Sequence, residues 1–120
     1  MVTMVRKRAV ILLSGLNEWG RAFHALVYTK DLSAHGNEPR LFFDGPGTQW
    51  LDKLLGGGEG LRPIFDELQE DGLVEAACNS CSTACKTADA AKAPEVSLTA
   101  EGTHVAVGEL ARAGYDVIVV

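Results

Sequence analysis

The chain has 120 residues, 47% apolar and 22% charged, which fits one compact domain over residues 1–120 and excludes a disordered chain. The formal net charge of −5 argues against nucleic acid as a partner, because nucleic-acid-binding proteins usually carry a basic patch. The apolar runs are too short to cross a membrane, and the run at 9–13 is too short for a secretory signal, so we expect a cytoplasmic protein with no membrane partner.

Along the chain, apolar runs alternate with segments whose apolar side chains recur at helical spacing. The apolar runs predict strands at residues 8–14, 39–44, 73–77, 95–98 and 116–120. The helical spacing predicts helices at residues 18–34, 48–55, 61–71, 79–92 and 103–113. Asn17 is the expected N-cap of the first helix, and Gly36 its expected terminator. This alternation predicts a three-layer α/β/α fold around a five-stranded parallel sheet, of the flavodoxin-like or Rossmann-like kind.

The carboxyl edge of such a sheet is the default position of a ligand site. Four segments are expected to meet there, at residues 14–17, 44–47, 78–81 and 99–104. They bring Asn17, Asp44 and His104 to the rim of the site. His104 is expected on the same helical face as Val107 and Ala111.

Three cysteines lie within a run of eight residues, at positions 78, 81 and 85, where the third predicted strand gives way to a helix. Cys78 directly follows the third predicted strand, and Asn79 or Ser80 is expected to cap the helix that begins there. Because a helix N-terminus stabilises a thiolate, we expect a lowered pKa and a nucleophilic role for Cys78. The i, i+3, i+7 spacing predicts that all three sulfurs line one face of the helix. A structural disulfide framework is a poor interpretation, since the cysteines are odd in number and tightly clustered.

Other interpretations of the cysteines stay open. Cys78 and Cys81 have the C-x-x-C spacing of a redox disulfide, although the context of a thioredoxin is absent. The three thiolates with His104 would supply four metal ligands, but their spacing matches neither zinc-ribbon nor ferredoxin patterns. Cysteine also packs well as a small apolar residue, which fits Cys85 best. We expect no bound metal and no other cofactor.

Several segments, taken in order along nearly the whole chain, match the pattern of a known protein family. They comprise the strand at 9–13 with its long following helix, the run 41–47 with Trp50, a cysteine after the third strand, and the closing run 113–118. In this succession the chain resembles the DsrE/DsrF-like family of small sulfur-relay proteins. The resemblance implies a five-stranded parallel sheet and assembly into a dimer, trimer or hexamer. It also implies that Cys78 carries a persulfide and passes its sulfur to a partner protein.

The leading hypothesis is therefore a cytoplasmic persulfide carrier that exchanges sulfur with donor and acceptor proteins or with small sulfur compounds. Cys78 is the expected sulfur acceptor, and Cys81 the nearest resolving or assisting thiol. Four further residues are expected to assist: Cys85, His104, Asn17 and Asp44. The alternative is a non-catalytic oligomeric module that binds a small ligand or a partner at the same edge. In that module Trp50 and the loop 45–47 would matter more than the thiols.

Overall fold

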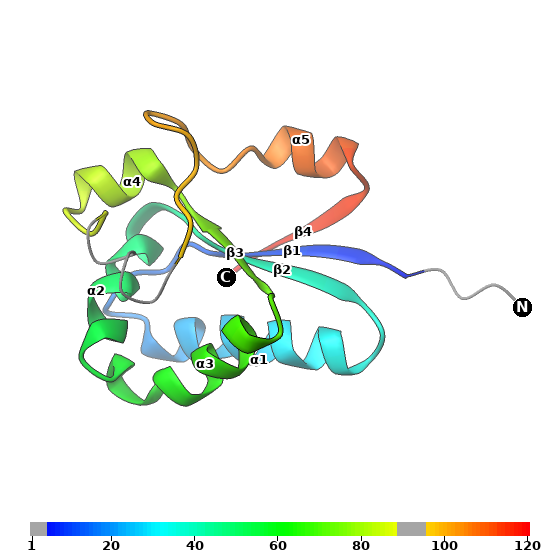
Figure 1. The fold of residues 1–120 in the computed structure, drawn as a ribbon, viewed down its shortest axis with the longest axis horizontal. Helices are drawn as coiled ribbons and strands as arrows, with labels where there is room; N and C mark the ends of the chain where they lie inside the picture. Colours follow the sequence, from blue (N-terminus) through cyan, green and yellow to red (C-terminus); the bar gives the residue numbers. More distant parts are fainter. Residues whose placement is uncertain (1–4, 89–95) are drawn as a thin grey trace, which may run out of the picture.

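The computed structural model describes residues 5–88 and 96–120, which form a parallel sheet with helices on both faces (Figure 1). The strands are β1 (Lys7–Leu12), β2 (Glu38–Phe43), β3 (Val74–Ala77) and β4 (Tyr115–Val119). The α-helices are α1 (Trp19–Ala34), α2 (Trp50–Leu55), α3 (Arg62–Glu70), α4 (Asn79–Ala84) and α5 (Val107–Arg112). Two short 3₁₀ helices, η1 (Gly45–Gln49) and η2 (Gly58–Gly60), flank α2.

The sheet has the strand order β3-β2-β1-β4, and every neighbouring pair is parallel. In the register of the central pairs, Lys7 of β1 lies opposite Glu38 of β2 and Tyr115 of β4. The predicted α/β class and the parallel sheet are therefore confirmed. The described part of the chain forms four strands, however, and not the predicted five.

The difference lies at the strand predicted for residues 95–98, of which Glu95 falls outside the described residues. Leu98 forms a single parallel bridge with Ala77. The Ala77 N–H donates to the Ser97 carbonyl at 2.8 Å, and the Thr99 N–H donates to the Ala77 carbonyl at 3.0 Å. A turn then follows, in which Gly102 has a φ of 73°. β3 itself ends at Ala77, the partner of Leu98, so within the described residues the pairing is limited to one bridge.

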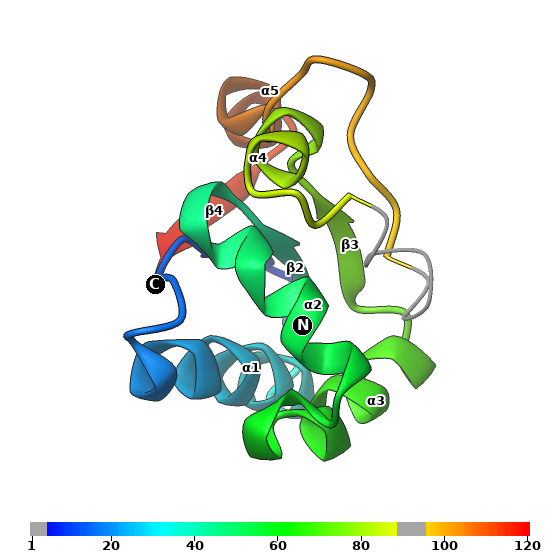
Figure 2. The same cartoon turned by 90° about the vertical axis from the view of Figure 1, so that its left-hand side faces the viewer.

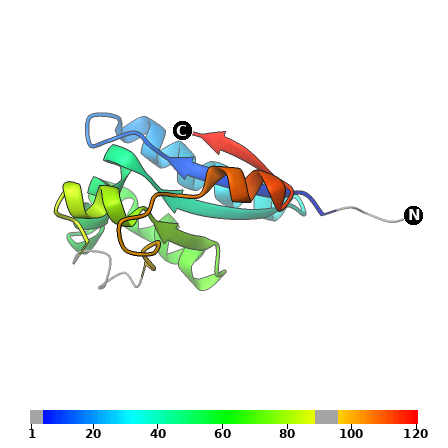
Figure 3. The same ribbon diagram turned by 90° about the horizontal axis from the view of Figure 1, so that it is seen from above.

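The two faces of the sheet are covered unequally (Figures 2 and 3). Against one face, α1, α2 and α3 pack a large apolar core on β1 and β2, whose fully buried members include Leu12, Phe43, Trp50 and Phe65. The opposite face carries a smaller cluster of buried residues, namely Ala9, Ile11, Phe42, Cys78 and Val105. On that side α5 has no buried residue. The hydrophobic stabilisation of the fold therefore comes mainly from the first face.

The helix predicted for residues 79–92 ends much earlier in the structure, at Ala84. Lys86 takes a left-handed backbone conformation with a φ of 59°. Its N–H donates to the Thr83 carbonyl, and the Thr87 N–H donates to the Ser82 carbonyl at 2.8 Å. These two hydrogen bonds are those of a Schellman motif, which satisfies the last carbonyls and closes the helix. The end of the prediction, from residue 89 onward, lies outside the described residues.

The first helix begins one residue later than its expected cap. Glu18, not Asn17, occupies the N-cap of α1, because a turn that joins the Glu18 N–H to the Gly15 carbonyl at 3.0 Å precedes the helix. Gly36 follows the helix as predicted, with a φ of 83° and its N–H on the Ser33 carbonyl.

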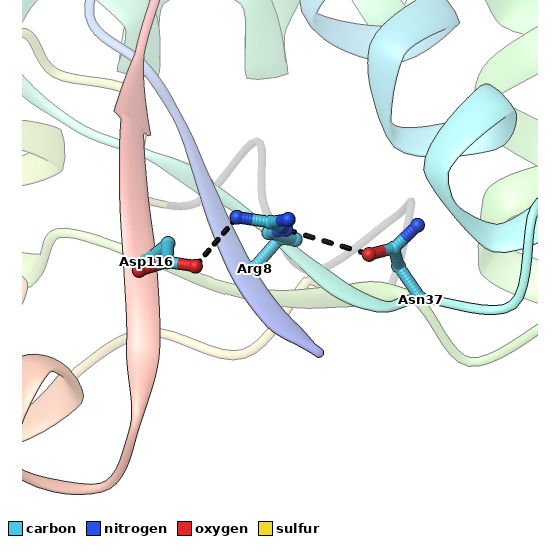
Figure 4. Close-up of polar contacts among 3 residues, drawn as sticks. All are labelled: Arg8, Asn37 and Asp116. Atoms are coloured by element: carbon cyan, nitrogen blue, oxygen red, sulfur yellow. Dashed lines mark hydrogen bonds and ion pairs between the residues drawn. The ribbon is translucent and has the colours of Figure 1, made fainter. Parts of the chain in front are cut away.

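An arginine connects three elements across the amino end of the sheet (Figure 4). Arg8 of β1 forms an ion pair with Asp116 of β4, and its Nε donates to Asn37 Oδ1, in the α1–β2 connection, at 3.4 Å. In the described parts of the chain, no helix combines the length and apolar character of a membrane-spanning segment.

Candidate functional site

Cys78 and Cys81 meet where β3 ends and α4 begins. Cys78 itself is the N-cap of α4, and its Sγ accepts the N–H of Cys81 at 3.3 Å. The predicted caps, Asn79 and Ser80, are instead the first two residues of the helix. The capping bond brings the first turn of α4 onto the sulfur of Cys78, so the two thiols lie within 4.8 Å of each other.

His104 reaches the same place from the segment that precedes α5. Its Nδ1 lies 3.4 Å from Cys78 Sγ and 3.8 Å from Cys81 Sγ. The expected face shared with Val107 does not form, because α5 begins only at Val107 and His104 lies outside it. The predicted meeting of segments 78–81 and 99–104 at the carboxyl edge is nevertheless observed.

Two threonines that the sequence does not single out hold this segment against α4. The Ser80 N–H donates to the Thr103 carbonyl at 3.1 Å, and the Asn79 N–H donates to Thr99 Oγ1 at 2.9 Å. The Thr103 carbonyl also lies 3.7 Å from Cys78 Sγ, within reach of its S–H. No local motif marks these roles, since the contacts join segments about 20 residues apart in sequence.

Asp44 borders the cysteine pair from the end of β2. Its Oδ1 lies 3.7 Å from Cys81 Sγ and accepts the N–H of Gly45 at 3.0 Å. The second bond makes Asp44 the N-cap of η1, which fixes the carboxylate beside Cys81.

Asn17 and Cys85 lie apart from this group. Asn17 is exposed and lines a surface depression together with Gly15, Pro46 and Gln49. Cys85 is half-buried at the C-cap of α4, outside the group formed by Cys78, Cys81 and His104. The donor atoms that lie within 4.8 Å of one another include two of the three sulfurs, and the expectation that all three line one wall stays a prediction.

The pKa of Cys78 moves in the direction opposite to the prediction. Burial first of all, together with the side chains of Cys81 and Asp44, raises the pKa of the Cys78 thiol from 9.0 to about 11. The N–H of Cys81 lowers the pKa, but this single bond does not offset the loss of hydration. Cys78 is 0% exposed, whereas Cys81 reaches the surface in part.

A cavity of about 660 Å³ lies next to the pair, and His104 lines it as well as contacting both sulfurs. Its other lining residues include Phe42, Thr99, Thr103 and Leu110. Trp50, in contrast, is 0% exposed and donates its Nε1–H to the Ser14 carbonyl at 3.1 Å. It belongs to the core and is not available to a ligand at the surface.

Comparison of the chain with protein-family models and with curated proteins gives no match. The resemblance to the DsrE/DsrF-like family therefore stays a prediction. The geometry itself offers two neighbouring free thiols, one buried and one partly exposed, with an imidazole nitrogen beside both. Such an arrangement suits nucleophilic sulfur chemistry and the binding of thiophilic groups.

Proposed function

We propose that this protein is a persulfide carrier of the DsrE/DsrF-like type, with the Cys78–Cys81 pair as its sulfur site. The observation that carries the proposal is that two free thiols within 4.8 Å share one imidazole, whose Nδ1 is within 3.8 Å of both. A neutral imidazole accepts the proton of a thiol, which produces the thiolate that attacks sulfur.

Cys78 is buried and Cys81 is partly exposed, which favours a different role for each cysteine. A donor meets Cys81 first, because Cys78 is 0% exposed. The Cys81 proton moves to His104, and the Cys81 thiolate attacks the outer sulfur of a donor persulfide. The donor leaves as a thiolate that takes the proton from His104, and Cys81 becomes a persulfide.

Transfer to Cys78 then follows within the site. The Cys78 proton moves to His104, and the Cys78 thiolate attacks the outer sulfur of the Cys81 persulfide. The bond between the two sulfurs of that persulfide breaks, and the departing Cys81 thiolate takes the proton from His104. The sulfur then rests on Cys78, where burial shields it from external thiols until an acceptor arrives. These exchanges need no cofactor. Free thiols suit a reducing compartment such as the cytoplasm, and assembly into a homo-oligomer is part of the same proposal.

Intact-mass measurement after incubation with polysulfide tests the proposal. The reduced wild-type protein is expected to gain whole sulfur atoms that a reductant removes, and Cys81→Ser to lose most of this uptake. Cys78→Ser is expected to load but to lose the sulfur faster to added thiol. Cys85→Ser, a matched control in the same helix region, should load like the wild type.

Two outcomes would overturn the proposal. One is undiminished loading of the double variant Cys78→Ser/Cys81→Ser, and the other is no uptake by wild-type protein whose thiols are shown to be reduced. The second outcome would favour a binding module without catalysis, for which the cavity beside His104 is the supporting observation.

A further inference from the structure

We propose that Cys78, Cys81 and His104 bind one zinc ion, with the fourth coordination position left to solvent. This inference goes beyond the proposed sulfur chemistry, because it holds whether or not the thiols carry sulfur. It concerns the one group of three potential metal ligands, within the described residues, whose donor atoms all lie within 4.8 Å of one another.

The two separations between the imidazole nitrogen and the sulfurs are close to those that tetrahedral zinc requires. With Zn–S near 2.3 Å and Zn–N near 2.0–2.1 Å, tetrahedral angles place sulfur and nitrogen about 3.6 Å apart and two sulfurs about 3.8 Å apart. His104 Nδ1 lies 3.4 Å from Cys78 Sγ and 3.8 Å from Cys81 Sγ, which brackets the required value. The imidazole nitrogen therefore needs to shift only by tenths of an ångström relative to each sulfur, and the two sulfurs, which lie within 4.8 Å of each other, need to settle at about 3.8 Å.

The protein holds these ligands in place before any ion binds. Cys78 and Cys81 are fixed by the capping bond at the start of α4. His104 is fixed by its neighbour Thr103, whose carbonyl accepts the Ser80 N–H at 3.1 Å. Two thiolates neutralise the charge of Zn²⁺, and two cysteines with one histidine form a known donor set of zinc sites with an open position.

Asp44 stands beside the site without completing it. Its Oδ1 is 3.7 Å from Cys81 Sγ, but the carboxylate is not within 4.8 Å of all the other donor atoms. Its bond to the Gly45 N–H keeps it in that outer position. Because His104 is exposed and Cys81 partly so, water has access to the fourth position.

Titration of the full chain with Co²⁺, after reduction and removal of metal, tests the inference. We expect one Co²⁺ per chain, with a thiolate-to-cobalt charge-transfer band and the visible bands of tetrahedral cobalt. One equivalent of Zn²⁺ should abolish both. Cys81→Ser and His104→Ala should weaken Zn²⁺ binding at least tenfold, whereas Cys85→Ser and Asp44→Asn should retain the cobalt spectrum.

A second measurement covers the case in which a variant fails to fold. In the wild-type protein, Zn²⁺ should protect Cys81 from alkylation and leave Cys85 unprotected. Absence of the cobalt bands in reduced wild-type protein, or equal protection of Cys81 and Cys85, would overturn the inference. Loss of the spectrum in Asp44→Asn would overturn the open fourth position. Sulfur uptake is measured separately, so zinc binding without uptake supports this site while overturning the persulfide carrier.

Discussion

At the scale of single residues, the reactivity of the candidate site depends on the different surroundings of Cys78 and Cys81. Cys78 has no exposed surface and lies in the smaller core with Ile11 and Phe42. Removing its thiol from water penalises the thiolate, so the pKa of Cys78 rises to about 11. Cys78 is therefore protonated near neutral pH, and its deprotonation requires either the adjacent imidazole or a metal ion.

This raised pKa predicts a loss of stability in alkaline solution. The unfolded thiol titrates at 9.0 and the folded thiol at about 11, so the stabilisation is complete below pH 9 and is lost as the pH rises through 11. For metal-free protein we expect the free energy of unfolding to fall by on the order of 2 kcal/mol from this group. Urea denaturation across this range, on wild type and Cys78→Ala, measures it. An equal decline in both proteins would contradict the prediction.

At the scale of secondary-structure elements, the left-handed backbone conformation of Lys86 determines where α4 ends. Lys86 occupies the position of the Schellman motif that usually holds glycine, where a side chain costs about 1 kcal/mol. Lys86→Gly is therefore expected to stabilise the protein by about 0.5–1 kcal/mol in thermal or urea denaturation. Lys86→Ala is the matched control, because it removes the same long side chain but keeps the Cβ. Equal effects of the two substitutions would show that the backbone conformation is not responsible.

A comparison of α4 with the other helices and strands shows which parts of the fold the sequence can predict. Periodicity locates α1 well, because its buried residues recur at helical spacing, and a continuous apolar run locates β1, because consecutive residues of this strand are buried. The alanine-rich stretch after Cys85 favours a longer helix by propensity, but the Schellman hydrogen bonds of Lys86 and Thr87 end it. The predicted fifth strand pairs with β3 only at Leu98 in the described residues, because β3 ends at Ala77, its partner in that bridge.

In the candidate site, too, some features are predictable from the sequence and others are not. Chain topology alone brings Cys78, Cys81 and His104 to one edge, since they follow or precede elements that end there. The pKa of Cys78 was not predictable, because it depends on how deeply the neighbouring segments bury the sulfur. The position of Asn17 depends on where the preceding turn places the start of α1, which no motif in the sequence records.

Unequal covering of the sheet predicts unequal stability across the whole molecule. All residues of α5 retain some exposure, and β4 contains only exposed and half-buried residues, while the carboxyl-terminal ends of β1 and β2 are buried. Local opening requires little free energy where few apolar groups are buried. Hydrogen exchange is therefore expected to be faster in α5 and β4 than in β1 and β2. Uniform protection across the four elements would contradict this prediction.

The unequal covering of the sheet also affects the candidate site, because the two cysteines and His104 come from parts of the fold that are packed differently. Cys78 and Cys81 belong to the junction of β3 and α4, whereas His104 comes from the thinly packed segment before α5. We expect local opening of that segment to remove the imidazole and expose the sulfur of Cys78 to water while the central strands stay paired, because few buried apolar groups hold α5. The buried thiol would then react with a labelling reagent only when this segment opens. Its labelling rate would therefore report how often the segment before α5 opens.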